Sequence, residues 1–76
     1  MRHFKSWFAW LRATRAQVGM TQEELAHLTH SAASSIRNWE LETVKRPSLE
    51  KQVKIEKALQ ERAEARLIRI SPPPQI

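Results

Sequence analysis

The chain has 76 residues, which is enough for one small domain. Leu, Ile, Val and Phe make up 17 of them, just above the roughly 20% below which charged chains tend to stay disordered. No cysteine is present, so disulfides and thiolate metal ligands are excluded. The apolar run over residues 7–11 is too short to span a membrane, and no signal peptide is recognisable, so we expect a cytoplasmic protein.

The charge balance narrows the class of partner. Thirteen Lys and Arg oppose eight Glu, and the formal net charge is +5. A small and strongly basic domain suggests binding to a polyanion, most commonly a nucleic acid. Surplus basic side chains also simply keep a small helical protein in solution, and charge alone does not separate these two explanations.

One glycine and four prolines leave few breaks, so the chain is expected to be helical. A first helix is predicted because apolar residues recur at spacings of three, four or seven: Phe4, Trp7, Phe8, Leu11 and Val18. Gly19 supplies a left-handed stop. Consecutive helix positions diverge by about 100°, so the aromatic residues cannot all point inward, and Trp10 is expected to be partly exposed.

Two short helices follow. Thr21 and Glu24 form a capping box for a second helix, which is expected to bury Leu25, Ala26 and Leu28. The apolar pattern then stops over residues 29–31 and resumes with Ile36 and Trp39, three positions apart. This spacing predicts a third helix with Trp39 in the core and a polar outer face.

A basic loop over residues 41–47 precedes a fourth helix, for which Ser48 is the predicted N-cap. Its apolar positions are Leu49, Val53, Ile55 and Leu59, and the pattern continues through Ala63, Leu67 and Ile70. This last apolar segment is either helical or extended, and either folds back on the first helix or pairs with a second copy, which we favour. Residues 71–76 are expected to form a proline-rich flexible tail, since proline lacks the amide that a helix requires.

Two short helices joined by a three-residue break, with a basic loop after them, make a helix-turn-helix layout. The major groove of DNA admits one helix, whose outer side chains meet the base edges. The preceding helix crosses the backbone, where its free amides bind phosphate.

Residues 11–59 resemble the helix-turn-helix domain of the phage-repressor and Cro superfamily (the XRE family). The matching blocks are residues 20–26 (MTQEELA), residues 36–40 (IRNWE) and residues 45–50 (KRPSLE). The resemblance implies an all-α, compact five-helix, lambda-repressor-like fold over residues 1–70. It also implies binding to double-stranded DNA as a homodimer and control of transcription, with no cofactor.

The resemblance also assigns roles to individual residues. Gln22 would touch a phosphate and brace the third helix. The groove-facing residues would be Ala33, Ser34, Arg37 and Asn38, and the backbone contacts would come from Thr43, Lys45 and Arg46. Arg15 and Glu40 stand where the family often keeps an inner ion pair.

Three positions depart from the family pattern. His30 replaces the usual turn glycine, and a left-handed histidine costs roughly 1 kcal/mol. Ala32 replaces the usual N-cap serine, so Ser31 is expected to cap the third helix instead. Glu42 stands at the position of a common loop glycine.

We therefore expect a small bacterial or phage regulator, a repressor acting on operator DNA at the nucleoid, with polymerase as a further partner. Two alternatives stay open. One is an antitoxin-type module that covers a toxin with Trp10 or its C-terminal segment, and the other is an architectural DNA binder of low specificity. His27 and His30 lack a convincing third ligand, so no metal is expected. Ser31, Ser34 and Ser35 lie near these histidines, but a basic helix offers such a serine neither an oxyanion hole nor an enclosed pocket, so we do not expect an enzyme.

Overall fold

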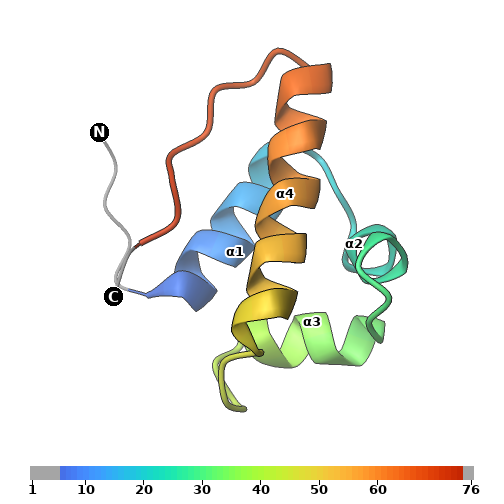
Figure 1. The fold of residues 1–76 in the computed structure, drawn as a ribbon, viewed down its shortest axis with the longest axis vertical. Coiled ribbons are helices and arrows are strands. Elements are labelled where there is room, and N and C mark those ends of the chain that lie inside the picture. The colour runs from blue at the N-terminus through green and yellow to red at the C-terminus, as the bar shows by residue number, and fades with distance from the viewer. Residues whose placement is uncertain (1–5, 75–76) are drawn as a thin grey trace.

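A computed structural model describes residues 6–74, and this range contains four α-helices: α1 (Trp7–Gln17), α2 (Gln22–Leu28), α3 (Ala33–Glu40) and α4 (Leu49–Ala65). Helix α3 lies across the N-terminal end of α4, with α2 beside α4 and α1 crossing its other face (Figure 1). The expected fifth helix is absent from residues 6–74, because the pattern after Leu59 prolongs α4 and the chain then becomes extended. Phe4, the predicted start of the first helix, lies outside the described residues.

Local side-chain chemistry explains where the helices begin. The hydroxyls of Ser6, Thr21 and Ser48 accept backbone N–H groups at 3.2, 3.0 and 3.2 Å, satisfying amides that lack a partner in the first turn. The predicted N-caps Thr21 and Ser48 are therefore confirmed. Gly19 follows α1 with φ +70°, the left-handed conformation expected for it.

The core contains both N-terminal tryptophans. Trp7 and Trp10 are 2% and 0% exposed, so the expectation that Trp10 is partly exposed is wrong. The two residues are three apart and share one face of α1, whereas Phe8 lies between them and is only partly buried. Trp39 likewise packs against the core while staying partly exposed.

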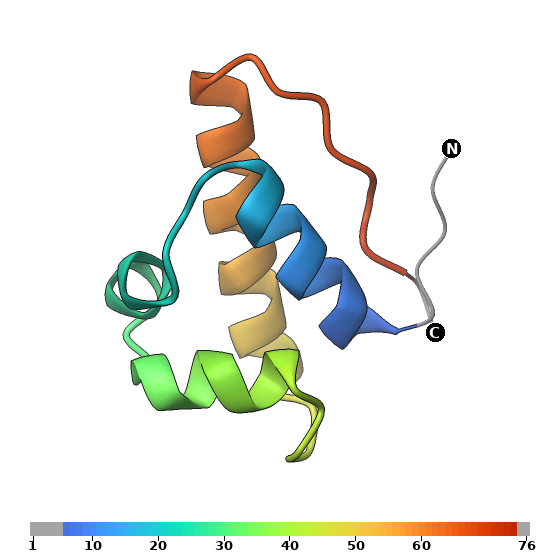
Figure 2. The same ribbon diagram turned by 180° about the vertical axis from the view of Figure 1, so that it is seen from behind.

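Trp10 is covered by residues 67–74, which we call the strap. The strap leaves the end of α4 and runs back along α1 (Figures 1 and 2). The Trp10 indole donates to the Ser71 carbonyl at 2.9 Å, and Gln17 donates to the Arg69 carbonyl at 3.0 Å. Ile68 and Ile70 pack against the core, so this segment is extended and folds back, and the favoured pairing of it with a second copy is wrong.

Several predicted core positions are exposed instead. Leu28, the last residue of α2, is 50% exposed. Leu49 and Val53 are 76% and 57% exposed, because Ile55, Leu59 and Ala63 form the buried side of α4. No helix within residues 6–74 is long and apolar enough to cross a membrane.

Candidate nucleic-acid interface

Helices α2 and α3 are joined by a tight turn over residues 29–32. His30 has φ +54°, as expected for the residue that stands at the position of a turn glycine. The Ser31 amide donates to the Ala26 carbonyl at 2.8 Å, and the buried Thr29 hydroxyl donates to the Leu25 carbonyl at 2.8 Å. These bonds close the end of α2 and set the direction in which α3 starts.

Ser31 does not cap α3, so that prediction is wrong. The N-cap is Ala32, which has no side-chain oxygen, and the Ser31 hydroxyl is engaged with Thr29 instead. The amides at the start of α3 therefore receive no side-chain cap from the protein. They stand at the end of α3 that a helix-turn-helix directs toward DNA.

Lys51 on α4 fastens this turn to the rest of the fold. Its ammonium donates to the Thr29 carbonyl at 2.6 Å and lies 3.4 Å from the His30 carbonyl. The sequence did not predict this role of Lys51, because nothing local to Lys51 indicates that α4 passes beside the turn. The contact holds the α2–α3 unit at a fixed angle to α4.

A buried ion pair braces the other end of α3. Arg15 donates to both carboxylate oxygens of Glu40, at 2.5 and 3.1 Å, and to the Met20 carbonyl at 2.7 Å. Gln22 donates to Glu40 at 3.1 Å, so the start of α2 is tied to the end of α3. The hydrogen bonds that Arg15 donates to Glu40 raise the pKa of Arg15 above its ordinary value. Such forked bonds fix orientation as well as distance.

The outward face of α3 carries the residues assigned to base contact. Ser34 and Arg37 are exposed, Ala33 is partly exposed, and Asn38 is half-buried. Ala33, Ser34 and Arg37 line a shallow depression of about 260 Å³ together with the start of α2. Two helices thus present one continuous polar surface.

Glu23 also lines this depression, beside Gln22. Glu23 was not among the predicted site residues, although its place in the first turn of α2, next to Gln22, points to the same surface. A carboxylate there repels phosphate and restricts which part of the depression a DNA strand occupies.

The loop after α3 brings the predicted phosphate contacts to different places. Thr43 lies against the end of α3, where its amide and hydroxyl donate to the Asn38 carbonyl at 3.1 and 3.2 Å. Glu42 precedes it with φ +59°, so the position of the usual loop glycine is left-handed here too. Lys45 is exposed.

Arg46 turns toward the protein rather than away from it. Its Nε donates to Gln52 at 3.0 Å, and its guanidinium lies 5.7 Å from the centre of the Trp7 ring. Arg46 therefore holds the loop against α1 and α4. A sequence motif alone does not reveal this, because Trp7 lies far away along the chain.

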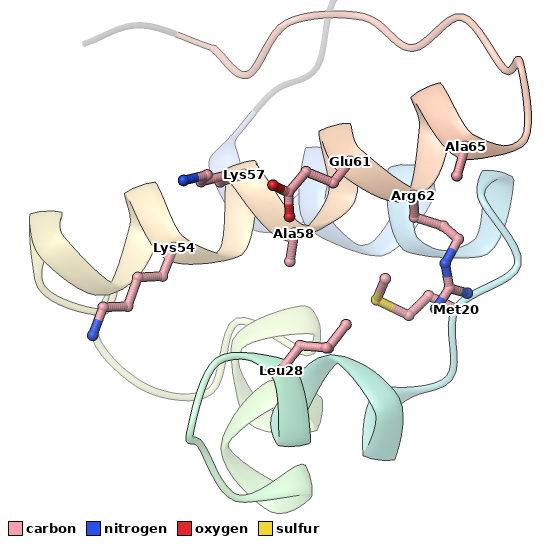
Figure 3. Close-up of a pocket in the computed structure, with 8 residues that line it drawn as sticks. All are labelled: Met20, Leu28, Lys54, Lys57, Ala58, Glu61, Arg62 and Ala65. Carbon is pink, nitrogen blue, oxygen red and sulfur yellow. The ribbon is translucent and has the colours of Figure 1, made fainter.

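A second concavity of about 440 Å³ lies between α2 and α4 (Figure 3). Leu28 and Met20 point into it, and Lys54, Lys57 and Glu61 stand along α4 at its rim. It is an open groove whose rim carries charges of both signs. Within residues 6–74, neither this groove nor any other place brings together three or more side chains that could hold a metal ion.

Glu24 and Arg62 form an ion pair that links α2 to α4 near this groove. The hydrogen bond from Arg62 lowers the pKa of Glu24 below its ordinary value, with a smaller contribution from the Thr21 backbone. One half of the predicted capping box forms, because the Thr21 hydroxyl accepts the Glu24 amide, whereas the Glu24 carboxylate mainly accepts the hydrogen bond from Arg62.

A braced helix pair with an exposed polar second helix defines a DNA-binding module of the helix-turn-helix class. A family model described as "Helix-turn-helix" matches residues 11–71. The chain belongs to this helix-turn-helix family of DNA-binding, transcription-regulator-type domains, the XRE type that the sequence resembles. The family is generally non-enzymatic. No curated protein and no solved structure gives a significant match.

Proposed function

We propose that this protein is a transcriptional repressor that binds operator DNA as a homodimer and acts in the cytoplasm at the nucleoid. The observation that carries the proposal is the outward face of α3, where Ser34 and Arg37 are exposed on a helix held at both ends. Such a helix enters the major groove without losing contacts to its own protein.

The proposal divides the work between base contacts and phosphate contacts. Arg37 and Asn38 read base edges, Arg37 toward guanine and Asn38 toward adenine, and Ser34 contributes a hydroxyl. Ala33 offers only a methyl contact. Lys45, Thr43 and the start of α2 at Gln22 position the phosphates, and Arg46 joins them through the part of its guanidinium not held by Gln52.

The two alternatives fare differently. The antitoxin-type alternative named Trp10 or the C-terminal segment as the surface that covers a toxin. Trp10 is buried, and in the C-terminal segment Ile68 and Ile70 pack against the core while Leu67 is exposed, so only the second surface stays open to this alternative. A DNA binder of low specificity is supported by the short side chains of Ala33 and Ser34, and the experiment below separates it from a repressor.

The experiment selects binding sites from a library of random duplexes and then measures affinity by fluorescence anisotropy at two salt concentrations. A repressor enriches one sequence and binds it more tightly than a scrambled duplex at both salt concentrations. For both duplexes the logarithm of affinity falls with the logarithm of salt, by about 0.9 per phosphate neutralised. Equal affinity for the selected and scrambled duplexes would indicate the architectural role.

Arg37→Ala tests base reading. It should weaken binding to the selected duplex about tenfold or more, while the scrambled duplex loses much less, because a base contact carries about 1–3 kcal/mol of discrimination. Arg12→Ala is the matched control, since Arg12 is an exposed arginine of α1 outside the helix-turn-helix. Equal losses on both duplexes for Arg37→Ala would contradict its base-reading role.

A further inference from the structure

The depression between α2 and α3 receives opposite charges from its two helices. Glu23 comes from α2 and Arg37 from α3, and both side chains are exposed. Neither takes part in any ion pair within residues 6–74. The other α3 residues of the depression, Ala33 and Ser34, have short side chains. A ligand that enters the depression therefore meets a charged hydrogen-bond acceptor and a charged hydrogen-bond donor together.

The direction of Glu23 follows from the packing of α2. The next residue, Glu24, accepts a hydrogen bond from Arg62 and so faces α4. Consecutive helix positions diverge by about 100°, and Glu23 accordingly lies on the side of α2 that borders α3. Gln22, the other α2 residue of the depression, donates its amide to Glu40. The Glu23 carboxylate is thus the charged acceptor that α2 offers to a ligand in the depression.

A phosphate group matches only half of this charge pattern. It accepts hydrogen bonds from Arg37, but the Glu23 carboxylate repels it. A guanine–cytosine pair matches both halves, because in the major groove guanine presents the adjacent acceptors O6 and N7 and cytosine presents its N4 amine as a donor. An adenine–thymine pair lacks the two adjacent acceptors that an arginine bonds on guanine.

We propose that Glu23 is a specificity-determining residue that reads cytosine, beside Arg37, at one guanine–cytosine pair of the DNA site. Arg37 donates to O6 and N7 of the guanine, and Glu23 accepts from N4 of the paired cytosine. This inference rests on the proposed function and deepens it, since it adds a residue of α2 to the base contacts of α3. Where no N4 amine faces Glu23, the carboxylate is desolvated against DNA without a partner, and binding weakens.

The first test removes single groups from both partners. The guanine is located as the base at which Arg37→Ala loses its preference, and its cytosine is replaced by a pyrimidine analogue that lacks the N4 amine. The analogue also weakens the base pair itself, and Glu23→Ala measures that effect alone. The affinity that the wild type loses on the analogue should exceed the loss of Glu23→Ala by about tenfold, the size of one base contact.

A scrambled duplex supplies a second readout of opposite sign. Glu23→Gln keeps the shape of the side chain and removes a charge that repels phosphate, so affinity for the scrambled duplex should rise about threefold while the preference for the selected duplex falls. A merely structural residue would lower both affinities when replaced. The matched control is Glu61→Gln, which removes the same charge from the groove between α2 and α4 and should leave the preference unchanged, because this groove shares no residue with the depression.

Two results would overturn the inference. One is an equal loss on the analogue for the wild type and Glu23→Ala, and the other is a Glu23→Gln variant that binds the scrambled duplex no more tightly than the wild type. Failure of the proposed function has a different outcome, since a wild-type chain that enriches no sequence from the library would refute sequence-specific binding itself. An enriched sequence that the wild type and Glu23→Ala read identically would refute only the role of Glu23.

Discussion

Replacing Glu40 by leucine should destabilise the fold more than any exposed substitution. The Glu40 side chain is 4% exposed and accepts hydrogen bonds from Arg15 and Gln22. In Glu40→Leu the Arg15 guanidinium, 18% exposed, keeps only the Met20 carbonyl at 2.7 Å. Removing one partner of a buried ion pair costs about 3–5 kcal/mol, and the partial exposure of Arg15 places this case near 3 kcal/mol.

That loss is large for a chain of this size. A domain of 76 residues has a free energy of unfolding of about 4–11 kcal/mol. Urea unfolding followed by tryptophan fluorescence should therefore show a midpoint lowered by about 2 M, for a slope near 1.5 kcal/mol/M. DNA affinity should fall as well, since Glu40 ties the end of α3 to the start of α2.

The double variant Arg15→Met/Glu40→Leu is the control for the buried charge. It leaves no unpaired guanidinium, so it should be more stable than Glu40→Leu alone. Two results would refute the reasoning: a cost below about 1 kcal/mol for Glu40→Leu, or a double variant whose cost equals the sum of the two single substitutions.

Three further predictions concern stability, each read from thermal unfolding. His30→Gly should raise the free energy of unfolding by up to about 1 kcal/mol, because it relieves φ +54°, whereas the control His27→Gly, inside α2, should lower it by a similar amount. Gly19→Ala should destabilise by about 1–2 kcal/mol, since φ is +70° there, and an unchanged melting temperature would contradict this. Arg62 lowers the pKa of Glu24, so the stabilisation by ionised Glu24 is present above its ordinary pKa of about 4.5 and disappears as the pH falls through the lowered value. Glu24→Gln should therefore melt below the wild type at neutral pH and at the same temperature in strong acid, and a gap that persists in acid would contradict this.

The features that the sequence predicts well are those decided by a few neighbouring residues. The caps at Thr21 and Ser48 depend on one hydroxyl and the amides three positions on. Gly19 and His30 are left-handed because each ends a helix in a tight turn. The helix-turn-helix itself is a local arrangement of this kind, and the family match agrees with it.

The predictions that fail concern which element covers which. The apolar periodicity around Trp10 would be the same with or without a later segment that covers this side chain, so it does not predict the burial of Trp10. The folded chain shows that the strap covers it. In the same way, Leu49 and Val53 fit the apolar pattern of α4, yet both are exposed. The other helices pack on the face of α4 that carries Ile55, Leu59 and Ala63.

The candidate site divides in the same manner. Periodicity places Arg37 on the outer face of α3, and it is exposed there. Arg46 belongs to a motif that suggests phosphate contact, but its position depends on Trp7 and Gln52, which approach only in the folded chain. Lys51 escaped notice for the same reason.

The strap has a consequence for how the protein is made. It joins α1 to residues 52 and 61 positions later, through the Gln17–Arg69 and Trp10–Ser71 bonds. Closing such long loops costs conformational entropy, and the short-range contacts within the helices do not offset this cost before the strap contacts form. A chain that emerges from the ribosome N-terminus first therefore exposes Trp10 until residue 71 has emerged. The helix-turn-helix can form before that point, but the strap closes over α1 only once residue 71 is available, and until then the Trp10 side chain is open to chaperones and to aggregation.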